Sequence, residues 1–368
     1  MNRLPKLSLR GRGEGVPANS LPASAQRHIG TILSSQPEAA AWLALLEAVL
    51  REGQNPRWDD LASATVLPAE RVPDAPLLTG ARISLGREPL PPAPLPVRGR
   101  GEHDDGAASR GAYLNTEPHP GRDTRHVTES LSSDARERGW GEGRTAETEF
   151  PLQAALHDWV SHLLLLASQA GPEAIPLARA AQSPTLDARG MVEAAINADD
   201  ARLERLADEL GVDIEPLAAV ADLAALPLLQ ALRRRFAPAV STHWHEGYCP
   251  ICGDWPRLAE IRGLERARCL RCARCGGDWQ QPGVRCAFCD ATGQGSRATL
   301  LSEQDGEARK VETCTRCRGY LKIISTLRAW PGDEVCLADL ATIDLDLAAL
   351  ERDYARPEPR GGLAVRIG

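Results

Sequence analysis

Four Cys-x-x-Cys pairs within residues 249–317 constrain this chain more than any other feature of its sequence. A Cys-x-x-Cys turn places two thiolates on the same side of a tight loop, and two such turns complete a tetrahedral four-sulfur site. The pairs therefore predict two metal sites with the ligands Cys249, Cys252, Cys272 and Cys275, and Cys286, Cys289, Cys314 and Cys317. This assignment joins neighbouring pairs across 19 and 24 residues, close to zinc-ribbon spacing. Pairing of the first turn with the third stays open.

Metal binding fits these cysteines better than disulfide formation does. All ten cysteines of this 368-residue chain follow residue 248, whereas disulfide frameworks are typical of short secreted domains. Since His245 is the last histidine, the ligands must be sulfur with at most a carboxylate. Four thiolates suit iron or zinc and disfavour magnesium, calcium or manganese. The spacing leaves zinc and rubredoxin-type iron as alternatives.

Other candidate ligands are kept outside the predicted sites. Cys269 lies three residues before Cys272 and could replace it if the register shifts. Cys336 stands alone at the start of a helical pattern, which is typical of a small buried residue. His243 and His245 would face the same side of a strand, but four cysteines already fill each site.

Hydrophobic periodicity and composition divide the chain into five regions. Helical patterns predict an N-terminal helical region at residues 1–89 and a helical domain at residues 149–240. Between them, residues 90–148 are rich in Pro, Gly and Arg without apolar periodicity, which predicts a disordered insertion. Two metal modules follow at residues 241–284 and 285–368, the second with a C-terminal helix and tail. The predicted class is α+β, with an all-helical N-terminal domain followed by two tandem rubredoxin-like or zinc-ribbon modules and a C-terminal helix.

Two helical patterns lead to more specific predictions. Residues 215–236 are apolar but interrupted by Pro227. Residues 335–354 predict the C-terminal helix, which Pro357 and Pro359 end, and we expect the last residues of the chain to be loose. The predicted apolar stripe of this helix is Leu337, Leu340, Ile343, Leu347 and Leu350. Trp255 and Trp279, soon after their turns, are each predicted to shield a metal site.

The charge distribution suits a protein partner at least as well as a nucleic acid. A net charge of −7 argues against a chain that binds nucleic acid through its overall charge. Residues 249–330 carry 14 Arg and Lys against 9 Asp and Glu, a net of +5, and residues 331–368 carry 4 against 8, a net of −4. Aromatic residues that could stack on bases make up only 4% of the chain. A non-catalytic zinc-ribbon module that binds nucleic acid stays the alternative function.

Enzymatic and membrane functions lack support in the sequence. We find no Ser/His/Asp set, phosphate-binding loop or paired carboxylates in a helical context, so the chain is predicted not to be an enzyme. A thiol–disulfide oxidoreductase would place one Cys-x-x-Cys at the start of a helix, whereas this chain has four Cys-x-x-Cys turns in one segment. No stretch approaches the ~20 apolar residues of a membrane span, and the N-terminus lacks the apolar segment of a secretory signal. Together with reduced thiolates, this predicts a cytoplasmic protein.

The residues around the cysteines resemble those of the formate dehydrogenase accessory protein family, FdhE. The resemblance covers about residues 247–356 and includes the C-terminal helix. Its motifs are Tyr-Cys-Pro-Ile-Cys-Gly-Asp-Trp-Pro at 248–256, Arg-Cys-Leu-Arg-Cys-Ala-Arg-Cys at 268–275, Arg-Cys-Ala-Phe-Cys at 285–289, and Glu-Thr-Cys-Thr-Arg-Cys-Arg-Gly-Tyr-Leu-Lys at 312–322. The family usually has an aromatic residue where this chain has Cys269, which supports leaving that cysteine out of the site. The insertion at 90–148 departs from the family.

The resemblance implies a cytoplasmic accessory protein with an N-terminal helical domain and two rubredoxin-like modules. The implied partner is the catalytic subunit of a respiratory formate dehydrogenase, bound before twin-arginine export. The implied cofactor is iron, as two ions in four-cysteine sites with a redox role, and zinc is the alternative. No turnover is implied, and self-association of the chain stays open.

Overall fold

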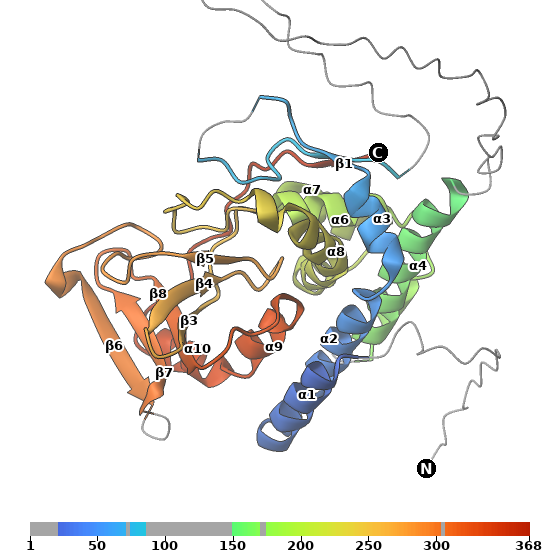
Figure 1. Cartoon of the computed structure of the whole chain (residues 1–368). Coiled ribbons are helices and arrows are strands. Elements are labelled where there is room, and N and C mark those ends of the chain that lie inside the picture. Colours follow the sequence, from blue (N-terminus) through green and yellow to red (C-terminus); the bar gives the residue numbers. More distant parts are fainter. Residues whose placement is uncertain (1–20, 71–73, 86–148, 170–173, 303–305) are drawn as a thin grey trace, which may run out of the picture. The chain divides into compact units, whose positions relative to one another are not determined.

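The protein is described by a computed structural model that covers residues 21–70, 74–85, 149–169, 174–302 and 306–368. The predicted disordered insertion at residues 90–148 lies outside the described residues. Helices make up the described chain before residue 240, apart from two short strands, and a sheet with two short helices follows (Figure 1). The predicted α+β class is confirmed, while the predicted domain boundaries stay a prediction.

The helices before residue 240 lie within the two regions, 1–89 and 149–240, in which the periodicity predicts them. In chain order they are α1 (Ala23–Ser35), the 3-10 helix η1 (Pro37–Ala39), α2 (Ala40–Glu52), α3 (Pro56–Ser63), α4 (Glu149–Ala167), α5 (Ala174–Ala180), α6 (Ala188–Asn197), α7 (Asp200–Leu210), α8 (Ile214–Phe236) and η2 (Ala237–Ala239). Side chains fix several helix starts. Asp187 and Asp199 accept hydrogen bonds from the first turns of α6 and α7, as N-cap residues do.

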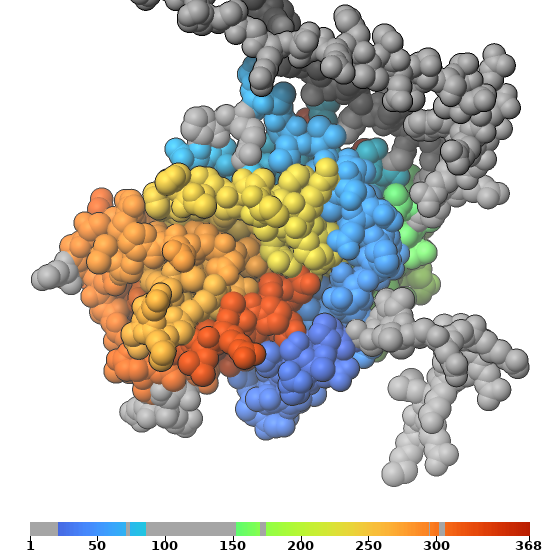
Figure 2. All heavy atoms as spheres, viewed as in Figure 1, coloured from blue at the N-terminus to red at the C-terminus, as the bar shows by residue number. Residues whose placement is uncertain are grey.

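A small apolar cluster joins the first helix to α9 (Val335–Leu340) in the C-terminal part of the chain. Leu337 on α9 is fully buried against a cluster that includes Ile29, Ile32 and Leu43. Figure 2 shows α1 in dark blue directly beside α9 in red-orange. Side-chain packing therefore holds α1 against α9, although the two helices are far apart in the sequence.

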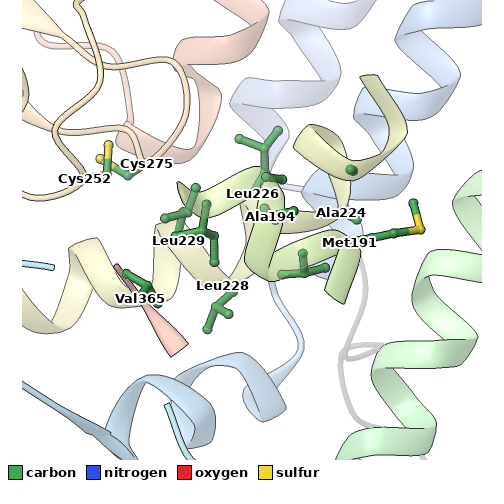
Figure 3. Packing of buried hydrophobic residues seen from close by; sticks show 14 of the residues in the cluster. Met191, Ala194, Ala224, Leu226, Leu228, Leu229, Cys252, Cys275 and Val365 are labelled. Carbon is green, nitrogen blue, oxygen red and sulfur yellow. The ribbon is translucent and has the colours of Figure 1, made fainter. Parts of the chain in front are cut away.

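Helix α8 lies at the centre of the helical region. It contacts α2, α3, α4, α6 and α7, and Figure 3 shows its Leu226, Leu228 and Leu229 near Met191 and Ala194 of α6. The helix continues through Pro227, although an interior proline typically costs about 3 kcal/mol. Burial on several sides offsets this cost, so the predicted interruption is wrong.

One described segment, Ile214–Ala239, is long and apolar enough to cross a membrane by length and composition. Its mean hydropathy is 1.4, and 67% of its most apolar window is buried inside the fold. The segment comprises α8 and η2, so its apolar composition is accounted for by its place in the core.

One six-stranded sheet joins the two predicted metal modules. Its strand order is β5-β4-β3-β8-β7-β6, with β3 (Leu258–Arg262), β4 (Ala267–Arg271), β5 (Asp278–Gln280), β6 (Arg297–Ser302), β7 (Gly306–Cys314) and β8 (Tyr320–Thr326); η3 (Gln294–Ser296) precedes β6. Neighbouring strands are antiparallel except β3 and β8, which are parallel with Leu258 opposite Lys322. The pairing of β3 with β8 makes the sheet continuous across the modules.

Two short helices replace the predicted single C-terminal helix. After η4 (Gly332–Glu334), α9 ends at Leu340 and α10 (Ile343–Leu350) begins after two intervening residues. The Thr342 hydroxyl donates to the Ala338 carbonyl at 2.9 Å, a local bond that competes with helix continuation. The predicted apolar stripe is wrong in its second half. The buried residues there are Leu345 and Ala349, whereas three residues of the predicted stripe are exposed: Ile343, Leu347 and Leu350.

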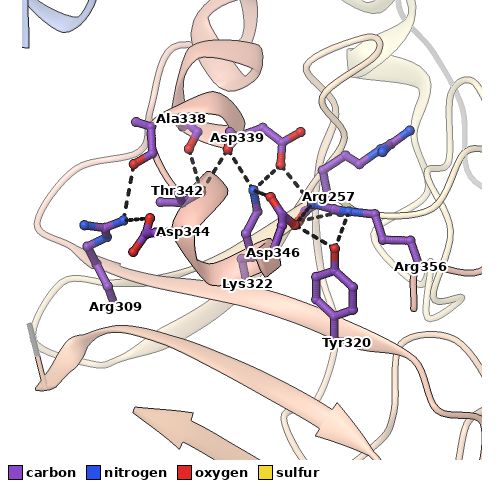
Figure 4. A network of polar contacts seen from close by, with 11 residues as sticks. Arg257, Arg309, Tyr320, Lys322, Ala338, Asp339, Thr342, Asp344, Asp346 and Arg356 are labelled. Atoms are coloured by element: carbon purple, nitrogen blue, oxygen red, sulfur yellow. Dashed lines mark hydrogen bonds and ion pairs between the residues drawn. The ribbon is translucent and has the colours of Figure 1, made fainter. Parts of the chain in front are cut away.

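The break between α9 and α10 places two carboxylates next to the buried side chain of Lys322. Lys322 Nζ on β8 lies 2.6 Å from Asp339 Oδ1 and 2.7 Å from Asp346 Oδ2, and Arg356 binds the same two carboxylates (Figure 4). Burial opposes ionisation of Asp339, but Lys322 and Arg356 outweigh it and hold the pKa of that carboxyl below its usual value. This network fixes α9 and α10 on the sheet.

The last residues of the chain are ordered into a second, small sheet. β9 (Arg366–Ile367) pairs in parallel with β2 (Arg82–Ile83), which pairs antiparallel with β1 (Thr65–Val66). Leu363, Val365 and Ile367 are buried. The prediction of loose terminal residues is therefore wrong, because this segment packs on the helical region.

Candidate metal centres

The four Cys-x-x-Cys turns share one backbone geometry. In each turn the carbonyl of the first cysteine accepts a hydrogen bond from the N–H four residues later, at 2.9–3.1 Å. That later residue adopts a left-handed φ, with values of 73°, 76°, 61° and 58° for Gly253, Gly276, Asp290 and Arg318. Glycine and aspartate tolerate this conformation. Arg318 is held in it by hydrogen bonds from its guanidinium to the carbonyls of Arg352 and Asp353.

The structure brings the first and second turns together into a first cluster. It comprises Cys249, Cys252, Cys272 and Cys275, all of them buried. The Sγ atoms of Cys249 and Cys275 lie 3.5 Å apart, as do those of Cys252 and Cys272. Figure 3 shows Cys252 and Cys275 beside the buried side chains of the core. The four sulfur atoms all lie within 4.8 Å of one another.

The third and fourth turns form a second cluster. It comprises Cys286, Cys289, Cys314 and Cys317, again with all sulfurs within 4.8 Å. The Sγ atoms of Cys286 and Cys317 lie 3.8 Å apart, and those of Cys289 and Cys314 lie 3.7 Å apart. Cys314 ends β7, and the loop before β6 carries the third turn. The pairing of the first turn with the third, left open by the spacing, is not the one that the structure adopts.

The sulfur positions fit one tetrahedral metal ion in each cluster. Four sulfurs bound to one ion at about 2.3 Å lie about 3.8 Å apart, close to the observed 3.5–3.8 Å. Disulfide sulfurs would lie about 2 Å apart, and all eight cysteines are free. The two clusters can therefore hold two metal ions, and the role of these cysteines as ligands stays a prediction.

The thiol acidities differ within and between the clusters. Burial raises the pKa of Cys249 well above its usual value and that of Cys286 to about 11. At Cys314 burial acts in the same direction, but the backbone N–H groups of Cys317 and Arg316 outweigh it and lower the pKa to about 7. Because neighbouring thiolates repel one another, four of them in one cluster require a bound cation.

One charged residue beside the first cluster is not predicted from the sequence. Arg274, inside the second turn, donates to the Ala195 carbonyl of α6 at 2.6 Å. Burial disfavours the charged form of the Arg274 guanidinium. The negative charges of Asp254 and the Cys252 thiolate contribute most to outweighing burial, so the pKa of Arg274 is raised. The guanidinium therefore places a positive charge next to a thiolate cluster. Its position between two cysteines was the only sequence signal.

The other candidate ligands lie outside both clusters. Cys269 is buried on β4 opposite Glu260. Cys336 is the second residue of α9, and its Sγ lies 3.7 Å from the carbonyl oxygen of Asp333. His243 and His245 are exposed. Their positions agree with leaving all four residues out of the predicted sites.

The two tryptophans take different positions around the clusters. Trp279 is buried in the same core cluster as the first four cysteines, and its indole N–H donates to the Glu246 carbonyl at 3.1 Å. Trp255 is half-buried. Its ring packs edge-on against the rings of Tyr248 and Phe288, with centroid separations of 6.1 and 5.6 Å. Phe288 lies inside the third turn, so Trp255 connects the flank of the first cluster to the second.

The family relationship of the C-terminal part follows from comparison with known proteins. Residues 284–361 match the model of the FdhE C-terminal domain. This span contains the whole second cluster together with α9 and α10. The C-terminal part of this chain is therefore similar to the FdhE C-terminal domain. The resemblance predicted from the cysteine motifs is confirmed.

Individual FdhE proteins give matches of similar extent. An FdhE homolog from Aquifex aeolicus is 32% identical over 139 residues, which are 35% of this chain and 47% of the relative. The homolog from Stutzerimonas stutzeri is 36% identical over 30% of this chain and 36% of its own length. FdhE from Escherichia coli is 35% identical over 30% and 35%. The chain thus spans less than half the length of each of these relatives.

One solved structure also aligns with the chain. The crystal structure of FdhE from Pseudomonas aeruginosa aligns with 57% of this chain and 95% of its own, at 18% identity and a TM-score of 0.35.

Proposed function

We propose that this chain is an accessory protein for a formate dehydrogenase, which binds the catalytic subunit in the cytoplasm before export. The observation that carries the proposal is the FdhE match over residues 284–361, which includes all four cysteines of the second cluster. The +5 charge of residues 249–330 supports a protein partner with an acidic surface. On this proposal the chain acts by binding and carries out no turnover.

We further propose that both clusters bind iron and that one or both ions take part in electron transfer. An all-sulfur donor set suits iron or zinc, and the observed sulfur separations fit such ions. A four-thiolate iron site supplies one-electron chemistry, since the same ligands can hold both oxidation states. The proposed ligands are Cys249, Cys252, Cys272 and Cys275 at one site and Cys286, Cys289, Cys314 and Cys317 at the other.

Co-purification without air tests the partner. A tagged formate dehydrogenase catalytic subunit is expected to retain the wild-type chain and the control variant Cys336→Ser, whose cysteine lies outside both clusters. The double variant Cys286→Ser/Cys289→Ser is expected to be retained at least tenfold less, with circular dichroism to check that it folds. No retention of the wild-type chain would contradict the proposed partner.

A further inference from the structure

The two four-cysteine clusters differ sharply in their exposure to solvent. The four cysteines of the first cluster are each 0% exposed. In the second cluster, Cys286 and Cys314 are buried, Cys289 is half-buried and Cys317 is exposed. The sulfur separations of the second cluster are also slightly longer, at 3.7 and 3.8 Å against 3.5 Å. The same donor set therefore occupies two different environments.

The helical region covers the first cluster. The backbone N–H groups of Leu77 and Leu78 donate to the carbonyls of Pro250 and Ile251, inside the first turn, at 2.8 and 3.0 Å. Pro76 packs so closely on Gly253 that an added Cβ would lie 2.9 Å from its Cγ. On the second turn, Arg274 is bound to the α6 backbone. Access to the first cluster therefore requires the helical region to separate from the two turns.

The second cluster is less completely covered than the first. Its cysteines Cys286 and Cys314 pack with Ala291 in a small separate apolar cluster, with Phe288 and Cys289 at its edge. Beyond the buried Cys314, the fourth turn is open to solvent, with four consecutive exposed residues: Thr315, Arg316, Cys317 and Arg318. Cys317 is therefore the ligand cysteine that a small molecule can approach most directly from solvent.

From this asymmetry we propose that the second cluster is an exchangeable metal site, opened through Cys317, while the first cluster is a permanent structural site. The incoming ligand is a soft donor such as a thiolate. It forms one bond to the ion as the bond from the ion to the Cys317 sulfur breaks, and no electron is transferred. The released thiolate takes a proton or reacts with an electrophile, so Cys317 is also the predicted site of thiol modification.

The difference in stability of the two sites follows from what each exchange must disrupt. Loss of the ion from the first cluster would leave four thiols inside the main apolar core, which includes residues of α6 and α8. Loss from the second would disturb chiefly its small satellite cluster, with Ala287 of the third turn as its link to the main core. This inference rests on the metal-binding part of the proposed function and is independent of the partner.

The test compares the rates at which the two ions leave the full chain. Protein carrying two zinc ions is mixed with excess EDTA under native conditions, and the loss of protein-bound zinc is followed by rapid desalting and elemental analysis. We expect one ion per chain to leave at least ten times faster than the other. In the variant Cys317→Ser the fast phase should accelerate or disappear, whereas Cys336→Ser should leave both phases unchanged. A single rate for both ions would overturn the proposal.

Labelling of the thiols with N-ethylmaleimide, read by peptide mapping, gives an independent measure. The four cysteines of the second cluster should be modified as the first ion leaves, with the first cluster still protected. Labelling of Cys249 and Cys275 at the same rate as Cys317 would overturn the inference. If the chain binds no metal, the proposed iron sites fail, but the order of labelling in the metal-free chain still decides whether the clusters differ in access.

Discussion

The side-chain amide of Asn197 on α6 binds both backbone polar groups of Val365, near the end of the chain. Its Nδ2 donates to the Val365 carbonyl and its Oδ1 accepts from the Val365 N–H, each at 2.8 Å. Val365 is 1% exposed, so water does not readily replace these bonds. The amide thus holds the final segment against the helical region in the way that a neighbouring strand would.

Removal of this amide is predicted to destabilise the fold. Asn197→Ala would leave two buried backbone groups unpaired, and we expect the free energy of unfolding to fall by about 2 kcal/mol. Urea denaturation measures this loss. Gln182→Ala, at an exposed position, serves as the control and should change stability by less than about 0.5 kcal/mol. Equal effects of the two substitutions would show that the amide bonds do not hold the tail.

The buried lysine of the sheet gives a second prediction. Lys322→Met removes the cation shared by Asp339 and Asp346, and breaking a buried ion pair from one side typically costs about 3–5 kcal/mol. The pair of the half-buried Lys310 with the exposed Glu307 should contribute at most about 1 kcal/mol. Thermal unfolding of Lys322→Met and Lys310→Met should therefore differ clearly. A similar loss in both variants would contradict the role given to the network.

A third prediction concerns the two faces of α10. Leu345 is 4% exposed and Leu347 is 56% exposed. Leu345→Ala should lower the free energy of unfolding by about 2–5 kcal/mol because it leaves a cavity, whereas Leu347→Ala should change it by no more than about 0.5 kcal/mol. Chemical denaturation of the two variants checks the orientation of the helix, and the reverse order of effects would refute it.

The alkaline titration of Tyr320 provides a fourth prediction. Burial raises the pKa of this phenol to about 12, Arg356 opposes the shift, and the hydrogen bond to Asp346 adds to it. A raised pKa in the folded state means that this stabilising contribution is complete below pH 10 and is lost as the pH rises through 12. The tyrosinate absorbance of the wild type minus that of Tyr320→Phe should titrate near pH 12. A midpoint near 10 would contradict the buried environment.

The sequence was most informative where the structure is local. Each Cys-x-x-Cys turn is determined by a few adjacent residues, and the shortest pairing of turns proved to be the one adopted. Helix starts such as Asp187 and Asp199 are local for the same reason. The FdhE-like motifs also predicted the family resemblance, because their residues surround these turns.

Most of the failures involve contacts between distant residues. The tail is ordered by Asn197, 168 residues before Val365, and no periodicity reports such a partner. The stripe on α10 was misplaced because Thr342 ends α9 and α10 then follows a new register. The parallel pairing of β3 with β8 likewise depends on tertiary packing, since the turns alone do not place one module beside the other.

Metal content and metal–sulfur distances of protein purified without air test the central claim most directly. Elemental analysis should give two ions per chain, and X-ray absorption spectroscopy should show four sulfur ligands at about 2.3 Å around each. Iron should give a thiolate-to-iron(III) band that appears on oxidation and bleaches on reduction, whereas zinc would make both sites colourless. A chain that contains no metal, or an ion bound by nitrogen and oxygen ligands, would contradict the assignment of the two clusters.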